Sequence, residues 1–246
     1  MTEAKGKLYL VATPIGNMGD ITIRALRTLS KASFIAAEDT RRTRKLLTRY
    51  KMSRSLLSYH DFNKTRVAPE IIRRIASGED VALVSDAGSP GISDPGFLLV
   101  KLAIAEGIDV VSIPGASSVI CALQISGLPT HNFVFEGFLP RKKGKRRAKL
   151  ESLKLEERTM VFFESPNRLR TTVAEMLEIF GDRKIAICRE LTKLFEEVLR
   201  TRLSQVEDLF SRRALKGEVV LVVEGKTATE DDMVIDTGET SELTEK

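Results

Sequence analysis

An apolar run that leads directly into a loop almost without large side chains is the feature that most constrains this fold. The run is Val81–Val84, and the loop "SDAGSPGISDPG" (residues 85–96) contains three glycines and two prolines. Apolar residues bounded by such turn residues are typical of a strand buried on both faces. Glycine after a strand permits left-handed backbone and lets a ligand approach the main chain closely. The stretch therefore predicts a parallel strand with a binding loop at its carboxyl end.

The same order of strand, Gly- or Pro-containing loop and helix recurs in the first half of the chain. Residues 7–12 are followed by "TPIGN" (13–17), and residues 109–113 are followed by "PGASS" (114–118). Parallel strands bring their carboxyl ends to one edge of a sheet, so we expect all three loops to meet. One such loop could be a simple turn whose serines cap a helix, but three that converge favour a small-molecule site.

A change of pattern near Gly127-Leu128-Pro129-Thr130 predicts two domains. Before it, strands alternate with helices, so we expect an α/β domain with a Rossmann-like, mostly parallel sheet over residues 1–127. Beyond it, short strands alternate less regularly with helices, which predicts a smaller α+β domain with a mixed sheet over residues 128–226. Asp94-Pro95 and Ser165-Pro166 each predict a helix start, with an N-cap acceptor followed by proline.

The charge of the chain is uneven along its length. The chain has 39 Lys and Arg and 34 Asp and Glu, of which residues 227–246 contain one basic and seven acidic residues. The rest of the chain therefore carries a formal charge of +11. The polar, aperiodic tail is predicted to be disordered. A body this basic is typical of proteins that bind a polyanion, although many soluble proteins are basic without such a partner.

Features of membrane, secreted and metal-binding proteins are missing from the sequence. Residues 1–7 contain no apolar signal region, and no apolar window reaches the length of a membrane span, so we expect a cytoplasmic protein. Cys121 and Cys188 stand alone within apolar runs, which favours buried packing over a disulfide or a metal site.

The loop after Val84 does not match the common nucleotide-binding motifs. It lacks the Gly-Lys-Ser/Thr of a Walker A loop, and glycines 88, 91 and 96 do not have the G-x-G-x-x-G spacing of a dinucleotide site. Backbone groups and Asp86, without a basic phosphate clamp, suit a ligand that carries positive charge. S-adenosylmethionine fits this description, because it combines ammonium and sulfonium centres with a carboxylate and an adenosine.

Six motifs, in order, carry a resemblance to a known family. They are "LYLVATPIGNMGDIT", "AEDTRRTRKLL", "VALVSDAGSPGISDPG", "SIPGASSVICAL", "FFESPNRL" and "CRELTK", and the similarity runs over residues 7–225. The sequence resembles the ribosomal RNA small subunit methyltransferase I family of the tetrapyrrole methylase superfamily. The resemblance implies a two-domain fold with S-adenosylmethionine in the cleft between the domains and no metal. It implies methylation of the ribose 2′-oxygen of a cytidine in the decoding centre of 16S ribosomal RNA, and homodimers are common in the superfamily.

The resemblance also implies which residues bind the cofactor. They come from the strand ends of the first domain and from one strand of the second: Leu10, Pro14, Gly16, Asp86, Gly88, Ser89, Ser117, Ser118 and Phe163. One departure concerns the central loop, where "SDAGSP" lacks the Gly-Gly-Asp-Pro of tetrapyrrole enzymes. This difference weakens the case for a porphyrinoid substrate.

Methyl transfer to a ribose hydroxyl needs a group that accepts the hydroxyl proton as the new bond forms. Strand-end acids are the candidates, and we select Asp39 first and Glu164 second. Each has a structural alternative, because Asp39 could cap the helix that follows it and Glu164 could pair with Arg168. Lys193 could lower the pKa of the hydroxyl by its charge, or it could form a salt bridge to Glu190.

Two basic runs, one in each predicted domain, point to RNA. Seven bases and no acid lie between Arg41 and Arg54, and seven bases lie in "PRKKGKRRAK" (140–149). Such runs suit phosphate contacts, which give affinity rather than sequence choice, although a charge run is often only a solvated face. The residues that we expect to contact RNA are Arg41, Arg42, Arg44, Lys142, Lys143, Arg146 and Arg147.

Three functions fit these observations. The leading one is an RNA 2′-O-methyltransferase that acts on 16S ribosomal RNA or the small ribosomal subunit. A tetrapyrrole methylase acting on a uroporphyrinogen-like acid would also use basic residues, and a non-catalytic RNA-binding assembly factor would need no cofactor. Methyl incorporation into a tetrapyrrole identifies the second function, and failure to bind S-adenosylmethionine identifies the third.

Overall fold

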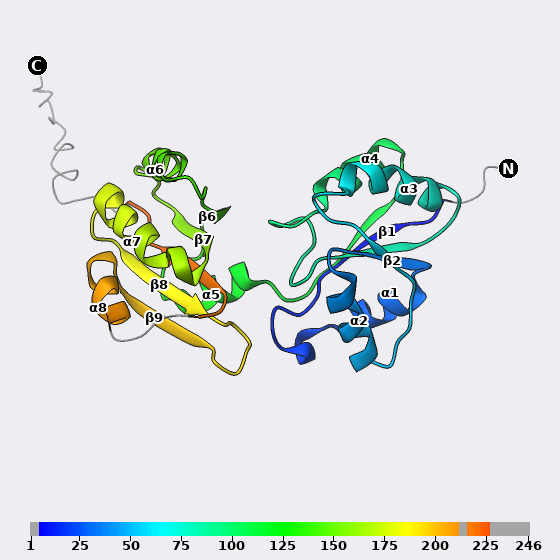
Figure 1. The fold of residues 1–246 in the computed structure, drawn as a ribbon, viewed down its shortest axis with the longest axis horizontal. Helices are drawn as coiled ribbons and strands as arrows, with labels where there is room; N and C mark the ends of the chain where they lie inside the picture. The colour runs from blue at the N-terminus through cyan, green and yellow to red at the C-terminus, as the bar shows by residue number, and fades with distance from the viewer. Residues whose placement is uncertain (1–4, 212–215, 227–246) are drawn as a thin grey trace, which may run out of the picture.

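Two five-stranded sheets form the centres of two lobes that lie side by side (Figure 1). The computed structural model describes residues 5–211 and 216–226, so the acidic tail that we expect to be disordered lies outside the described residues. Within the described ranges, no helix has both the length and the apolar character that a membrane crossing requires.

Short apolar runs form the strands of the first sheet. In spatial order they are β3 (Leu56–Ser58), β2 (Phe34–Ala37), β4 (Val81–Val84), β1 (Leu8–Val11) and β5 (Val110–Ile113), and every neighbouring pair is parallel. Every residue of β2 and β4 is buried, as their uninterrupted apolar sequences predict. The predicted parallel sheet is confirmed. The sequence did not predict the edge strand β3, because three residues carry too little pattern.

Helices cover both faces of this sheet, as a doubly wound α/β arrangement requires. α3 (Lys64–Ala76) and α4 (Phe97–Ala105) pack on one face, and α1 (Ile23–Lys31) and α2 (Thr40–Arg49) pack on the other. The two cores contain, among others, Ile71, Leu83 and Leu99 on the first face and Leu29, Leu47 and Val84 on the second.

The α4 helix begins later than the sequence predicts. Its N-cap is Gly96 rather than Asp94. Gly96 packs so closely on Gly91 that an added Cβ would lie 2.8 Å from the Cα of Gly91. The loop therefore doubles back on itself before the helix starts. This bend leaves Asp94 without a capping role and places it in the wall of a cavity.

The second sheet is mixed, as predicted. Its strands in spatial order are β6 (Phe133–Phe138), β7 (Thr159–Glu164), β10 (Val219–Val223), β8 (Lys184–Arg189) and β9 (Glu197–Arg202). β6 and β7 are parallel, and the other neighbours are antiparallel. The central strand β10 is buried along its whole length, so both faces of this sheet are covered.

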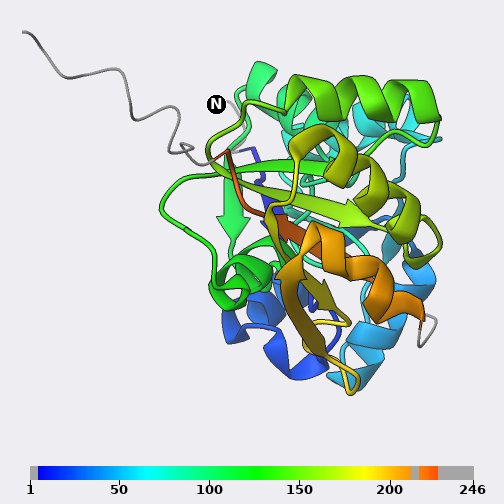
Figure 2. The same ribbon diagram turned by 90° about the vertical axis from the view of Figure 1, so that its left-hand side faces the viewer.

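One face of the second sheet is covered by helices from the same lobe. These are α6 (Lys143–Ser152), α7 (Pro166–Phe180), the 3₁₀ turn Leu203–Gln205 and α8 (Val206–Ser211), of which α8 lies in front in Figure 2. α7 starts at Ser165-Pro166, as predicted. The predicted end of the last helix, near residue 214, lies outside the described residues.

The other face of the second sheet is covered by α5 (Ser118–Ser126), which Figure 1 shows in the second lobe. Val119 and Leu123 of α5 pack in one core with Ala186 and Val220 of the sheet. We therefore propose that the chain passes between the lobes before Ser118 rather than at residue 128. The sequence could not show this, because an apolar helix face fits either sheet.

Candidate functional site

The three loops that end β1, β4 and β5 meet at the carboxyl edge of the first sheet, as predicted. Thr13 N donates a hydrogen bond to Gly88 O (2.9 Å), and Gly88 N donates one to Thr13 O (3.0 Å), so the first two loops are joined directly. Gly88 has a φ of +78°, a backbone conformation that would be strained in a residue with a side chain. A Cβ on Gly115 would lie 2.9 Å from the Cβ of Ala12, so the third loop packs on the end of β1.

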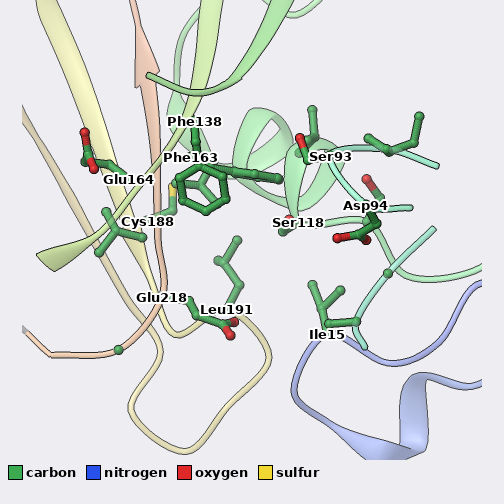
Figure 3. Close-up of a pocket in the computed structure, with 18 of the residues that line it drawn as sticks. Ile15, Ser93, Asp94, Ser118, Phe138, Phe163, Glu164, Cys188, Leu191 and Glu218 are labelled. Atoms are coloured by element: carbon green, nitrogen blue, oxygen red, sulfur yellow. The ribbon is translucent and has the colours of Figure 1, made fainter. Parts of the chain in front are cut away.

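Two adjoining cavities lie at this edge. The first has a volume of about 350 Å³ and is lined by both lobes (Figure 3), and the second has a volume of about 220 Å³. Ile15, Ala87 and Glu218 line both of them. The cavities are therefore neighbours with a shared wall, so molecules bound in the two could lie next to each other.

Aromatic and aliphatic side chains form one wall of the first cavity. Phe163, at the end of β7, meets Phe135 and Phe138 with ring centroids 5.0 and 5.4 Å apart. Cys188 and Leu191 continue this wall from the second lobe. Burial raises the pKa of the Cys188 thiol to about 11, so at neutral pH the thiol is protonated and serves as an apolar surface.

Polar groups of the first lobe and of α5 form the opposite wall, where Figure 3 shows Asp94 and Ser118. Ser117 is the N-cap of α5 and accepts a hydrogen bond from Ile120 N at 3.5 Å. Burial, reinforced by the negative charges of Glu38 and Asp86, raises the pKa of Asp94 to about 6, although a hydrogen bond with Ser85 acts in the opposite direction. Because burial disfavours the ionised form of Asp94, a cation that binds beside it would stabilise that form strongly.

The second cavity has a basic wall. Arg42 and Lys45 of α2 line it, together with Lys193 from the second lobe. Asp86 lines it as well: its carboxylate accepts a hydrogen bond from Asp39 N at 2.9 Å and lies 3.4 Å from Nε of Arg42. Asp86 thus holds the start of the basic helix α2 at the end of β4.

The residues predicted to bind a cofactor divide between the two cavities. Gly88, Ser89, Ser117, Ser118 and Phe163 line the first, which supports their assignment to one site. Pro14, Gly16 and Asp86 line the second. Leu10 packs against the core beneath the sheet edge. Position at a strand end thus predicts that these residues gather at one edge of the sheet, but it does not say which of the two cavities each side chain faces.

The structure gives Asp39 a structural role. Its carboxylate caps α2 by accepting a hydrogen bond from Arg41 N at 2.8 Å, and it pairs with the Arg41 guanidinium at 2.8 Å. These bonds lower the pKa of Asp39 to about 2. A carboxylate so strongly stabilised in its ionised form is a poor proton acceptor, so the geometry argues against the predicted role as a base.

Glu164 is also occupied by neighbouring groups. Its side chain is buried and accepts hydrogen bonds from Ser165 N (2.7 Å), Thr172 Oγ1 (2.7 Å) and Arg168 (3.1 Å). Figure 3 shows the carboxylate turned away from the cavity beside Phe163. The pairing with Arg168 that the sequence offered as an alternative is present, and it leaves Glu164 in a poor position to act as a base.

Four of the residues predicted to contact RNA belong to the run that starts at Pro140, and the structure separates them. Arg146 is buried against α7, where it forms a bidentate pair with Glu175 at 2.7 and 2.8 Å. It cannot reach a phosphate without breaking that pair, so its predicted role is corrected. Arg147 is bidentate to Glu178 at 2.6 Å. Lys142 and Lys143 are exposed.

The basic helix α2 retains its predicted exposure. Arg41, Arg42 and Arg44 are all exposed, and Arg44, Lys45 and Arg49 line a shallow surface hollow on this helix. Arg42 reaches the second cavity, as its position in the first turn of α2 allows. The helix therefore carries positive charge from the open surface to the mouth of that cavity.

Sequence reasoning missed two acids of the site. The sequence predicts Asp94 to cap a helix, and Glu218 carries no signal beyond its position before an apolar run. The glycine pair that bends the chain at Gly91 and Gly96 was the available signal for Asp94, because a helix rarely begins inside such a loop.

Comparison with known proteins identifies the family. Residues 7–207 match the family described as Tetrapyrrole (Corrin/Porphyrin) Methylases. The chain is 52% identical over 223 residues to the ribosomal RNA small subunit methyltransferase I of Halalkalibacterium halodurans, covering 91% of this chain and 77% of the relative. It is 49% identical over 221 residues to the Thermotoga maritima protein of the same name, covering 90% and 99%. The chain belongs to the ribosomal RNA small subunit methyltransferase I family.

Solved structures of tetrapyrrole methylases share the fold. Uroporphyrin-III C-methyl transferase from Thermus thermophilus, complexed with S-adenyl homocysteine, matches with a TM-score of 0.62 and 20% identity, covering 89% of this chain and 97% of that one. The two-lobed tetrapyrrole methylase-like fold expected from the sequence is therefore confirmed. This member of the methyltransferase I family joins that fold to a basic helix at the mouth of its second cavity.

Proposed function

We propose that this protein transfers a methyl group from S-adenosylmethionine to the ribose 2′-oxygen of a cytidine in the decoding centre of 16S ribosomal RNA. One observation carries the proposal. Over nine-tenths of the chain, about half of the residues are identical to those of relatives named ribosomal RNA small subunit methyltransferase I. The substrate is the small ribosomal subunit or its RNA, so we place the activity in the cytoplasm. The homodimer expected from the resemblance stays a prediction.

The first cavity fits the cofactor in size and chemistry. Its volume of about 350 Å³ is within the usual range for ligand sites. Phe163 would lie against the adenosine, and the free N–H groups at the start of α5, beside Ser118, would take the cofactor carboxylate. Asp94 would take the ammonium group. When bound, the cofactor supplies an activated methyl group on a sulfonium centre.

The second cavity is where we place the acceptor nucleotide. It adjoins the first cavity, so a ribose held there can present an oxygen to the methyl group, and alignment of the two groups is the main catalytic requirement. Arg42 and Lys45 at its mouth carry the positive charge that a phosphate backbone needs. A nucleotide reaches such a recess when it leaves the base stack, and an unpaired or loop nucleotide does this at the lowest cost.

The test uses purified protein, labelled S-adenosylmethionine and small ribosomal subunits that lack the modification. We expect label in 16S RNA, at a single cytidine, in a form that resists alkaline cleavage because its 2′-oxygen is methylated. Label on a base instead of a ribose, or no label in RNA, would refute the proposal.

One other substrate class has an observation in its favour, since the fold is that of tetrapyrrole methylases. A parallel reaction with uroporphyrinogen III therefore serves as the comparison, and we expect no methyl incorporation there. An assembly factor without activity would leave both substrates unlabelled and would not bind the cofactor, which equilibrium binding measures directly.

A further inference from the structure

The loop of residues 190–196, between β8 and β9, crosses from the second lobe to the first. Asn17 N donates a hydrogen bond to Thr192 Oγ1 at 3.1 Å. A Cβ on Gly16 would lie 2.4 Å from Cγ of Lys193 and 3.0 Å from the carbonyl oxygen of Leu191. Only glycine at position 16 lets the loop pack here, and this packing delivers Lys193 into the second cavity.

The backbone of this loop is held in an uncommon conformation. Glu190 and Thr192 have φ values of 51° and 66°, in the left-handed region that side chains rarely adopt. Such strain persists only where surrounding contacts fix it, and it clusters at functional sites. One such contact is visible at Gly217, where an added Cβ would lie 2.4 Å from Cδ of Glu190.

Two carboxylates hold the Lys193 ammonium group. Its Nζ lies 2.8 Å from Oε1 of Glu190 and 3.1 Å from Oε2 of Glu218. Glu190 Oε1 also accepts a hydrogen bond from Glu218 N at 2.9 Å, which fixes Glu190 in place. Burial acts against the charged form of Lys193, but the bonds to both glutamates outweigh it and its pKa is raised. Lys193 is therefore a cation at neutral pH and cannot itself serve as a base.

The two partners of Lys193 differ in what else they reach. Glu190 is largely buried, with a side chain 19% exposed, whereas the Glu218 side chain is 71% exposed. Glu218 also lines both cavities, and Figure 3 shows its carboxylate in the space between the lobes. Of the two carboxylates, Glu218 is the one that a bound ribose can contact.

We propose that Lys193 and Glu218 activate the acceptor hydroxyl in the second cavity, with Glu190 as the residue that positions Lys193. This inference rests on the proposed function. The ammonium group contacts the ribose oxygen and stabilises its developing negative charge. The oxygen attacks the methyl carbon, the carbon–sulfur bond breaks with its electron pair going to sulfur, and S-adenosylhomocysteine leaves. The hydroxyl proton passes to the Glu218 carboxylate.

Single-turnover methylation of unmodified small subunits at saturating cofactor tests this assignment. We expect Lys193→Met and Glu218→Gln each to slow the reaction about 100-fold or more, the usual cost of losing a charge-stabilising donor or a proton acceptor. Lys193→Arg should recover part of the rate because it restores the charge. The matched control is Lys216→Met, which removes an exposed lysine two residues before Glu218. Cofactor affinity, measured by calorimetry, should stay within about twofold of wild type in every variant. An unchanged affinity shows that the variant is folded.

Conservative variants separate the loss of a reacting group from a purely structural effect. Besides Lys193 and Glu218, the charged groups at this cavity are Glu190 on the loop of Lys193, Arg42 and Lys45 on α2, and Asp86 after β4. Glu218→Asp keeps a carboxylate and should recover part of the rate that Glu218→Gln loses, as Lys193→Arg does for Lys193, while Lys216→Met keeps the wild-type rate. A wild-type rate in Lys193→Met or Glu218→Gln overturns this inference alone. Unlabelled RNA with the wild-type protein overturns the proposed function and this inference with it.

Discussion

Cofactor affinity should fall steeply in acid because one carboxylate in the first cavity is hard to ionise. Asp94 faces that cavity, and its pKa is raised to about 6 by burial and by the charges of Glu38, Asp86 and Asp61. A cation bound beside it requires the ionised form, so protons compete with the cofactor below that pH. The favourable interaction is complete above the raised pKa and is lost as the pH falls through it.

The size of the effect follows from that pKa. An acid with a pKa of about 6 is about nine-tenths ionised at pH 7 and about one-tenth ionised at pH 5. The dissociation constant for S-adenosylmethionine should therefore rise about tenfold between pH 7 and pH 5. The amino group of the cofactor stays protonated over this range, so the change belongs to the protein.

Isothermal titration calorimetry at several pH values measures this dependence. The Asp94→Asn variant should bind about tenfold more weakly at pH 7 and should lose most of the pH dependence. The control is Asp109→Asn, which removes an exposed carboxylate that pairs with Lys7 at 3.0 Å and does not act on Asp94. A wild-type affinity that is level from pH 7 to pH 5, or full affinity in Asp94→Asn, would refute the reasoning.

Three further predictions test the assignments of the second lobe. Replacing Arg146 with Met should destabilise the protein by about 3 kcal/mol, because the buried Glu175 loses its partner, and should lower Tm by about 6–12 °C. The double variant Arg146→Met/Glu175→Met should recover most of this loss when thermal unfolding is followed by circular dichroism. An unchanged Tm in the single variant would contradict the assignment. Replacing Lys142 and Lys143 with Gln should reduce the slope of log RNA affinity against log salt concentration by about 1–2 in filter-binding assays. The double variant Arg146→Met/Glu175→Met should leave this slope unchanged. Phe163→Ala should weaken cofactor binding about tenfold at constant RNA affinity; equal losses of both would argue against an adenosine contact.

The sequence predicts the parallel sheet and the meeting of its loops for a clear reason. Buried parallel strands are short apolar runs, and the carboxyl ends of such strands must lie at one edge. Gly88 and Ser117 could thus be assigned to one site without coordinates. Which of two adjoining cavities a loop residue faces depends on contacts with distant segments, as Asp86 shows by binding Asp39 N and Arg42.

Long-range pairing explains the residues that sequence reasoning misplaced. A run of bases does not say which side chain faces the core, but Leu150 lies four residues after Arg146, on the same helix face, and was a usable signal. Asp94 and Glu218 gain their surroundings from segments far away in the chain. No local pattern describes those surroundings, so the two acids could be found only in the folded molecule.

The bend after β8 has an evolutionary consequence. The bend belongs to the second lobe but packs on Gly16 of the first, so under the proposed mechanism neither lobe alone would hold a complete site. On that mechanism, we expect a hybrid that takes one lobe from a distant relative to keep both sheets and still lose turnover, unless the glycine and the bend are exchanged together. Diversification of this architecture must therefore proceed by paired changes across the junction, which restricts how freely its halves can be recombined.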